Sequence, residues 1–168
     1  MSLYFGEELL LKKEKIVTAV IVFLVTYALF SLAGVLFPVD REWYESLNKP
    51  DWTPSGRLIG TIWSVLFAFI SLSAALVYAT YDLRKAAAPF WITLITNYLF
   101  NQAFSYFQFT QKNLLAAAVD SFFVAITALS LTFIAWRIHK TAAILFIPYV
   151  LWSFFATYLA FTIYGMNH

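Results

Sequence analysis

The residues that could carry chemistry lie inside apolar stretches of the chain. Asp120 is the only ionisable residue between positions 114 and 136, which read LLAAAVDSFFVAITALSLTFIAW. The apolar stretch before it carries Asn97, Asn101, Ser105 and Gln108 at intervals of four, four and three residues, which is one face of a helix. An acid is costly in hydrocarbon, so such residues usually face a protein interior. The pattern predicts a polar site inside a helical bundle.

Three roles are open for Asp120: a proton relay, a hydrogen-bond partner of Asn101 or Ser105, or an acceptor aimed at a ligand. An apolar site disfavours the charged carboxylate, so the neutral acid could also donate a hydrogen bond. A relay usually shows further acids or histidines along its path, and the apolar stretches contain none. This argues against a pump. The polar face could likewise bind a ligand or join helices through amide hydrogen bonds, and we favour the ligand.

Large aromatic residues accompany these polar positions. Trp63 and Phe67 are four residues apart and share a helical face, and Phe104 and Trp152 stand in stretches crowded with rings. Rings around a few polar groups suit a flat, conjugated and mostly apolar ligand. A tetrapyrrole or a sterol fits this description, and a small ion does not.

We expect no metal site and no required cofactor. The chain has no cysteine, so thiolate ligation is excluded. His139 lies in a connection and His168 is the last residue, so neither can provide an axial ligand for haem at the centre of a bundle. A porphyrin ligand would therefore be metal-free.

The composition is typical of an integral membrane protein. Of 168 residues, 62% are hydrophobic and only 12% are charged, about half of the charge of soluble domains. Each apolar stretch reaches the length of about 20 residues that a membrane-spanning helix needs. The sequence predicts an all-α membrane protein, a bundle of five transmembrane helices in one domain over residues 1–168, with spans at 16–37, 57–81, 89–109, 114–136 and 142–165.

The connections refine this prediction. Residues before Lys12 are irregular and are left out of the predicted fold. Proline ends the first span at Pro38, Pro89 suits the first turn of the third, and Pro148 predicts a kink in the fifth. Asn113 and Thr141 are expected to cap the fourth and fifth spans. Loop 38–56, rich in aromatics and prolines and including Trp52, could fold back as a lid over one end of the bundle.

Charge sets the expected surroundings. A net charge of +2 is too small to suggest nucleic acid. Five spans place the termini on opposite sides of the membrane. The N-terminal side then holds seven of the eleven lysines and arginines, which favours a cytoplasmic N-terminus; they are Lys12, Lys13, Lys15, Arg84, Lys85, Arg137 and Lys140.

Several spaced motifs resemble the TspO/MBR family, the tryptophan-rich sensory proteins related to the mitochondrial translocator protein. KPDWTP (49–54), WSVLF (63–67), FNQAFS (100–105), the alanine-rich stretch ending at Asp120, and PYVLWSFFATYLAFTIYGMN (148–167) follow in the family's order. The resemblance covers residues 16–167 and is close to Bacillus-type members. Ser55, Phe67, Phe104 and Ala160 depart from the family pattern, which bears on ligand preference and on light chemistry at position 104.

The resemblance implies a bacterial multi-pass cell-membrane protein and a homodimer in the lipid bilayer. It implies binding of protoporphyrin IX, or of isoquinoline carboxamide or benzodiazepine-type compounds, to sense, sequester, transport or degrade porphyrins in light. The motifs and the polar face together give these predicted ligand-binding residues: Trp52, Trp63, Phe67, Asn97, Asn101, Phe104, Ser105, Asp120 and Trp152. Trp63 and Trp152 are the candidate catalytic residues of the alternative, a porphyrin photo-oxidase. A proton-coupled secondary transporter using Asp120 is the other alternative, although no inverted repeat is visible. Cholesterol is not expected as the physiological ligand.

Overall fold

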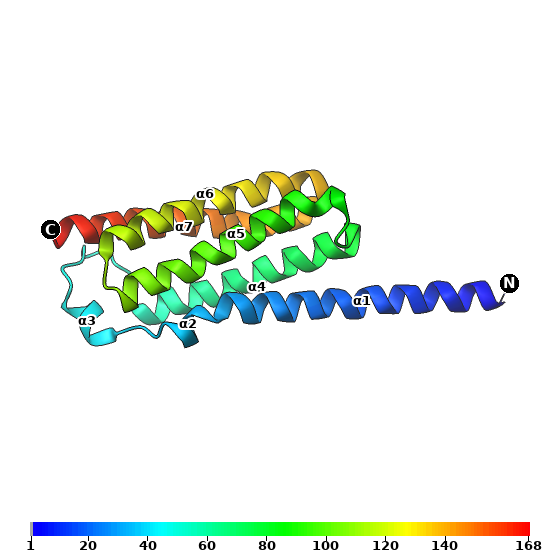
Figure 1. The fold of residues 1–168 in the computed structure, drawn as a ribbon, viewed down its shortest axis with the longest axis horizontal. Coiled ribbons are helices and arrows are strands. Elements are labelled where there is room, and N and C mark those ends of the chain that lie inside the picture. Colours follow the sequence, from blue (N-terminus) through cyan, green and yellow to red (C-terminus); the bar gives the residue numbers. More distant parts are fainter. Residues whose placement is uncertain (1) are drawn as a thin grey trace.

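The computed structural model describes residues 2–168, with side chains from Lys13 onward, and this part of the chain is entirely helical apart from its connections. Figure 1 shows long helices lying side by side, with the two chain ends at opposite ends of the bundle. The helices in order are α1 (Ser2–Ser31), α2 (Ala33–Leu36), α3 (Arg41–Ser46), α4 (Gly56–Tyr81), the 3₁₀ turn η1 (Lys85–Ala87), α5 (Ala88–Ser105), the π-helical turn η2 (Tyr106–Thr110), α6 (Leu114–Ile138) and α7 (Lys140–Met166).

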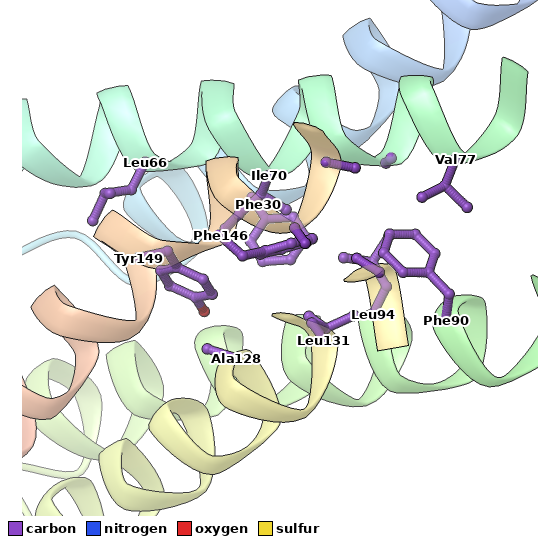
Figure 2. Packing of buried hydrophobic residues seen from close by; sticks show 14 of the residues in the cluster. Phe30, Leu66, Ile70, Val77, Phe90, Leu94, Ala128, Leu131, Phe146 and Tyr149 are labelled. Atoms are coloured by element: carbon purple, nitrogen blue, oxygen red, sulfur yellow. The ribbon is translucent and has the colours of Figure 1, made fainter. Parts of the chain in front are cut away.

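The five long helices form a ring. Helix α1 packs on α4, α4 on α7, α7 on α6 and α6 on α5, and α5 returns to α1 and α2. Inside the ring, Phe30, Ile70, Phe90, Leu131 and Phe146 are almost completely buried, and Figure 2 shows them meeting from all five helices. Outward-facing positions are also apolar, as a lipid environment requires.

Four segments are long and apolar enough to cross a membrane: Lys13–Leu36, Gly56–Tyr81, Leu114–Ile138 and Lys140–Met166. The fifth long helix, α5, has 18 residues. Its amides at Asn97, Asn101 and Gln102 lower its hydropathy, and η2 extends it toward Thr110. The prediction of an all-helical membrane protein is confirmed. Four of the five expected spans are long and apolar enough to cross a membrane.

The helix ends test the predicted caps. The Asn113 side chain accepts from the Ala116 amide, as expected, and Pro89 lies in the first turn of α5. The cap predicted at Thr141 is wrong, because His139 Nδ1 accepts from the Ala142 amide instead. The exclusion of the residues before Lys12 is also wrong, since α1 begins at Ser2.

Small residues bring α6 and α7 close together. Ala117, Ala125 and Ala128 of α6 and Ala143 of α7 are fully buried, and small side chains let helix backbones approach in a membrane. The Thr157 hydroxyl of α7 donates to the Ser121 carbonyl of α6 at 2.9 Å. This contact fixes the position of the α7 residues that face the candidate site.

Candidate ligand-binding site

A buried polar cluster joins α5, α6 and α7. The Tyr149 hydroxyl donates to Asn97 Oδ1 at 2.8 Å and accepts from Asn101 Nδ2 at 2.6 Å. Asn97 Nδ2 also donates to the Val124 carbonyl and to Thr127 Oγ1, at 3.1 and 2.8 Å. Asn97 and Tyr149 are both 0% exposed, and the Tyr149 ring enters the core from α7 (Figure 2). Asn97 uses its amide fully within the protein, so it holds three helices together.

The other residues of the predicted polar face differ in burial and in hydrogen bonding. Asn101 is buried, while Ser105, the last residue of α5, is half-buried and makes no side-chain hydrogen bond to any residue that the structure describes. Gln108 is buried within η2. The structure therefore brings Asn97 and Asn101 together, and leaves Ser105 outside the cluster.

Asp120 is 5% exposed, and no side chain or amide of the described chain donates a hydrogen bond to its carboxyl group. The expected hydrogen bond from Asn101 or Ser105 is absent from the described residues, because the Asn101 amide is directed to Tyr149. The Oδ2 atom of Asp120 is completely buried. A buried acceptor without a partner is rare and calls for a physical reason.

Two further buried groups of this kind are Gln102 Oε1 of α5 and the Trp152 indole of α7. The Trp152 Nε1–H is covered but has no acceptor among the described residues. The Trp152 ring lies 5.1 Å from Phe155, whose ring lies 5.9 Å from Trp52 in the loop. Trp52 also stacks on Tyr158 at 5.5 Å. These rings form a continuous aromatic wall from α7 to loop 38–56.

A second aromatic group reaches the polar cluster. Trp63 lies 6.1 Å from the Tyr149 ring, edge to face, and 5.6 Å from Phe67. The half-buried Phe104 ring pairs with none of these rings, although its motif position suggested it. Trp63 and Phe67 therefore meet Tyr149 and, through its hydroxyl, Asn101, whereas Phe104 forms no ring pair with them.

An open groove of about 500 Å³ lies between α4 and α7, within the range of about 300–1,000 Å³ that is usual for small-molecule clefts. Ile62, Leu66 and Phe69 line it from α4, and Pro148, Trp152 and Phe155 from α7. Its walls are almost entirely apolar. The groove can therefore hold a flat apolar group, with Trp152 at its wall.

Loop 38–56, the lid loop, is fastened to the end of the bundle that carries the C-terminus (Figure 1). The Asn48 amide donates to Asn167 Oδ1 at 3.0 Å, and Asn167 Nδ2 donates back to the Asn48 carbonyl at 2.8 Å. Asp40 pairs with Lys112 of the α5–α6 connection at 2.9 Å. Together with the Trp52 stack, these contacts attach the loop to both sides of the bundle.

The Asp40 anchor gives a prediction for pH and salt. The Lys112 ammonium and the Trp43 amide, both hydrogen-bonded to the Asp40 carboxylate, lower the pKa of Asp40 below its ordinary value. Because the folded pKa is the lower one, the anchor is complete above the ordinary pKa of about 3.9 and is lost as the pH falls through the folded pKa. We expect no change in protection of the α3 amides from hydrogen exchange between pH 5 and 8, and a decrease in high salt.

Two variants separate the roles of Asp40. Asp40→Asn keeps the cap of α3 and removes the ion pair with Lys112. In this variant the protection of the α3 amides from hydrogen exchange should fall slightly and should no longer depend on salt. Asp40→Ala removes both and should expose α3 further. Equal exchange in the two variants, or salt-independent exchange in the unmodified protein, would contradict this assignment.

The fold defines a class of protein: a multi-pass helical membrane protein with buried polar and aromatic side chains next to loop 38–56. The sequence profile of the TspO/MBR family matches residues 16–165, and the chain belongs to this family. It is 64% identical over 154 residues to an uncharacterized membrane protein, YtaB, of Bacillus subtilis, covering 92% of this chain and 99% of the relative.

Two further relatives carry descriptive names. The tryptophan-rich protein TspO of Bacillus cereus is 53% identical over 150 residues, 89% of this chain and 97% of the relative. The human translocator protein is 30% identical over 130 residues, 76% of both chains. The predicted family and the predicted multi-pass cell-membrane location are thereby confirmed.

Proposed function

We propose that this protein binds a metal-free tetrapyrrole with carboxylate side chains, of the protoporphyrin IX type, at the lid-loop end of the bundle. One observation carries the proposal: a buried donor, Trp152 Nε1–H, and a buried acceptor, Asp120 Oδ2, both lack partners within the described protein. Each such group costs about 1–3 kcal/mol if it stays unpaired. A ligand that offers both an acceptor and a donor removes this cost.

The chemistry of a metal-free tetrapyrrole fits these groups. Its pyrrole N–H groups can donate to a carboxylate, and its imine nitrogens and carboxylates can accept from an indole. Its flat ring suits the aromatic faces of Trp63, Trp152 and Phe155. An isoquinoline carboxamide offers part of this combination: an aromatic plane and an amide oxygen that can accept from the Trp152 indole.

The human relative is called a translocator protein, and this name supports a role of the proposed binding in moving the porphyrin; the family resemblance equally supports sensing or sequestering it. Light-dependent breakdown of the porphyrin at Trp63 and Trp152 stays a prediction of the family resemblance, as does the homodimer. Proton-coupled transport has less support, because Asp120 lies in a membrane span without a second described acid or histidine beside it.

Titration of the purified protein with protoporphyrin IX, followed by quenching of tryptophan fluorescence, tests the proposal. We expect saturable binding, weakened about tenfold in Trp152→Phe, because a tenfold change corresponds to about 1.4 kcal/mol, the scale of one buried hydrogen bond. Isoquinoline carboxamide should compete.

Trp136→Phe is the matched control. Trp136 is 51% exposed and lies near the end of α6 that is opposite to Asp120. Its replacement should therefore leave the affinity for protoporphyrin IX unchanged. Absence of saturable binding would refute the proposed function, and equal weakening by the two tryptophan variants would refute the assigned site.

A further inference from the structure

We propose that the groove between α1 and α4 is a binding site for a phospholipid with an anionic headgroup, with an acyl chain in the groove and the phosphate on Lys15. The groove has a volume of about 360 Å³ and is apolar except for Lys15 at one end. It lies between α1 and α4, which run side by side in Figure 1, whereas Trp152 belongs to α7. This assignment is independent of the tetrapyrrole proposal.

Alanines create the groove. Ala19 of α1 faces Ala75 and Ala79 of α4, while Phe23 and Leu72 form its inner end. Small side chains between bulky neighbours leave a channel along the helix pair, where α1 and α4 pack against each other. A flexible hydrocarbon chain can fill such a channel, whereas a rigid planar ligand would need a wider one.

The length of the groove matches one leaflet. Eight residues separate Lys15 from Phe23, which corresponds to about 12 Å along a helix. One leaflet of the hydrocarbon core is about 15 Å thick, half of about 30 Å. A lipid whose phosphate lies at Lys15 would therefore place the first part of its acyl chain along the whole groove.

The charge at the groove mouth selects the headgroup. The apolar span of α1 begins at Lys13, so the exposed Lys15 lies at the level of the lipid headgroups. Among the residues whose side chains the structure describes, the same end of the bundle carries Arg84, Lys85, Arg137 and Lys140, against the acids Glu14 and Asp82. In the described chain Asp82 pairs with Arg84, and no carboxylate forms an ion pair with Lys15.

A phosphate compound without an acyl chain would contact only Lys15 and would leave the apolar groove empty. Inorganic phosphate or glycerol phosphate would meet a single exposed lysine, whereas a phospholipid adds burial of its chain against Ala19, Ala75 and Ala79. Cationic residues beside a membrane attract anionic lipids, and the groove adds a preference for one bound molecule. The occupant that uses both features is the anionic phospholipid.

Native mass spectrometry of the full chain tests this site, with phosphatidylglycerol and phosphatidylcholine of identical acyl chains. We expect one phosphatidylglycerol to be retained preferentially, and Lys15→Gln to reduce its retention about fivefold, the scale expected for one lysine beside an anionic surface. Lys13→Gln, which removes a neighbouring charge outside the groove, should change it little. Glycerol phosphate should not compete.

Filling the groove is the second test. Ala79 is exposed and its substitution leaves the core untouched, so Ala79→Leu should reduce retention of both lipids while circular dichroism stays unchanged. Equal retention of the two lipids, equal effects of Lys13→Gln and Lys15→Gln, or competition by glycerol phosphate would overturn the proposal. So would a change of oligomeric state in Ala79→Leu, because a second copy of the chain would then be the occupant.

Discussion

Replacing Tyr149 by phenylalanine should lower the free energy of unfolding by about 1–3 kcal/mol. The change removes one oxygen atom, but it leaves Asn97 Oδ1 without its donor and Asn101 Nδ2 without its acceptor. Hydrogen bonds between membrane helices average only about 0.6 kcal/mol. The larger value is expected here because both amides stay buried, where an unpaired group costs more than the bond was worth.

Denaturation in mixed micelles, followed by circular dichroism, measures this loss. Tyr158→Phe is the matched control on the same helix, since its side chain is 66% exposed and its hydroxyl bonds to no described residue. It should change stability by less than about 0.5 kcal/mol. A double variant with Asn101→Ala should cost less than the sum of the two single changes; additive costs would show that the two residues are not coupled.

The role of Tyr149 also shows what the sequence could and could not predict. The spacing of Asn97 and Asn101 correctly placed two amides on one buried face, because helical periodicity alone fixes that geometry. It could not reveal that Tyr149 occupies both amides, since the partner lies about fifty residues away on another helix. The signal that was missed is the tyrosine itself, three residues before Trp152: a buried phenol needs a hydrogen-bond partner, and the amide face was the available one.

The ends of the helices show a similar division. Local chemistry predicted the Asn113 cap and Pro89 in the first turn of α5, because both depend on a few neighbouring residues. It failed at Thr141, where His139 lies two residues earlier and takes the capping position. The attachment of the lid loop to Asn167 and Lys112 could not be predicted, since these contacts join distant parts of the chain. The sequence could suggest a lid only from its aromatic and proline content.

Asp120 provides the second large effect, in which stability and binding should change in opposite directions. Asp120→Val removes a buried carboxyl that receives no hydrogen bond within the described protein. We expect the ligand-free protein to become more stable by about 1–3 kcal/mol, because an unpaired buried polar group is replaced by an apolar one. We expect the affinity for protoporphyrin IX to fall about tenfold, since the same carboxyl is the proposed partner of the tetrapyrrole N–H groups.

Asp120→Asn is the matched control, because it keeps the shape and a buried acceptor but removes the acid. It should gain little stability, since its amide is as unpaired as the carboxyl it replaces, and it should keep part of the affinity through its remaining oxygen. Unfolding in micelles and porphyrin titration on the same samples give both quantities. If Asp120→Val loses stability as well as affinity, the carboxyl supports the packing of α6 in the ring, and a ligand role for it is refuted. Opposite changes would instead show that this acid is retained at a cost to the fold, as expected of a binding residue.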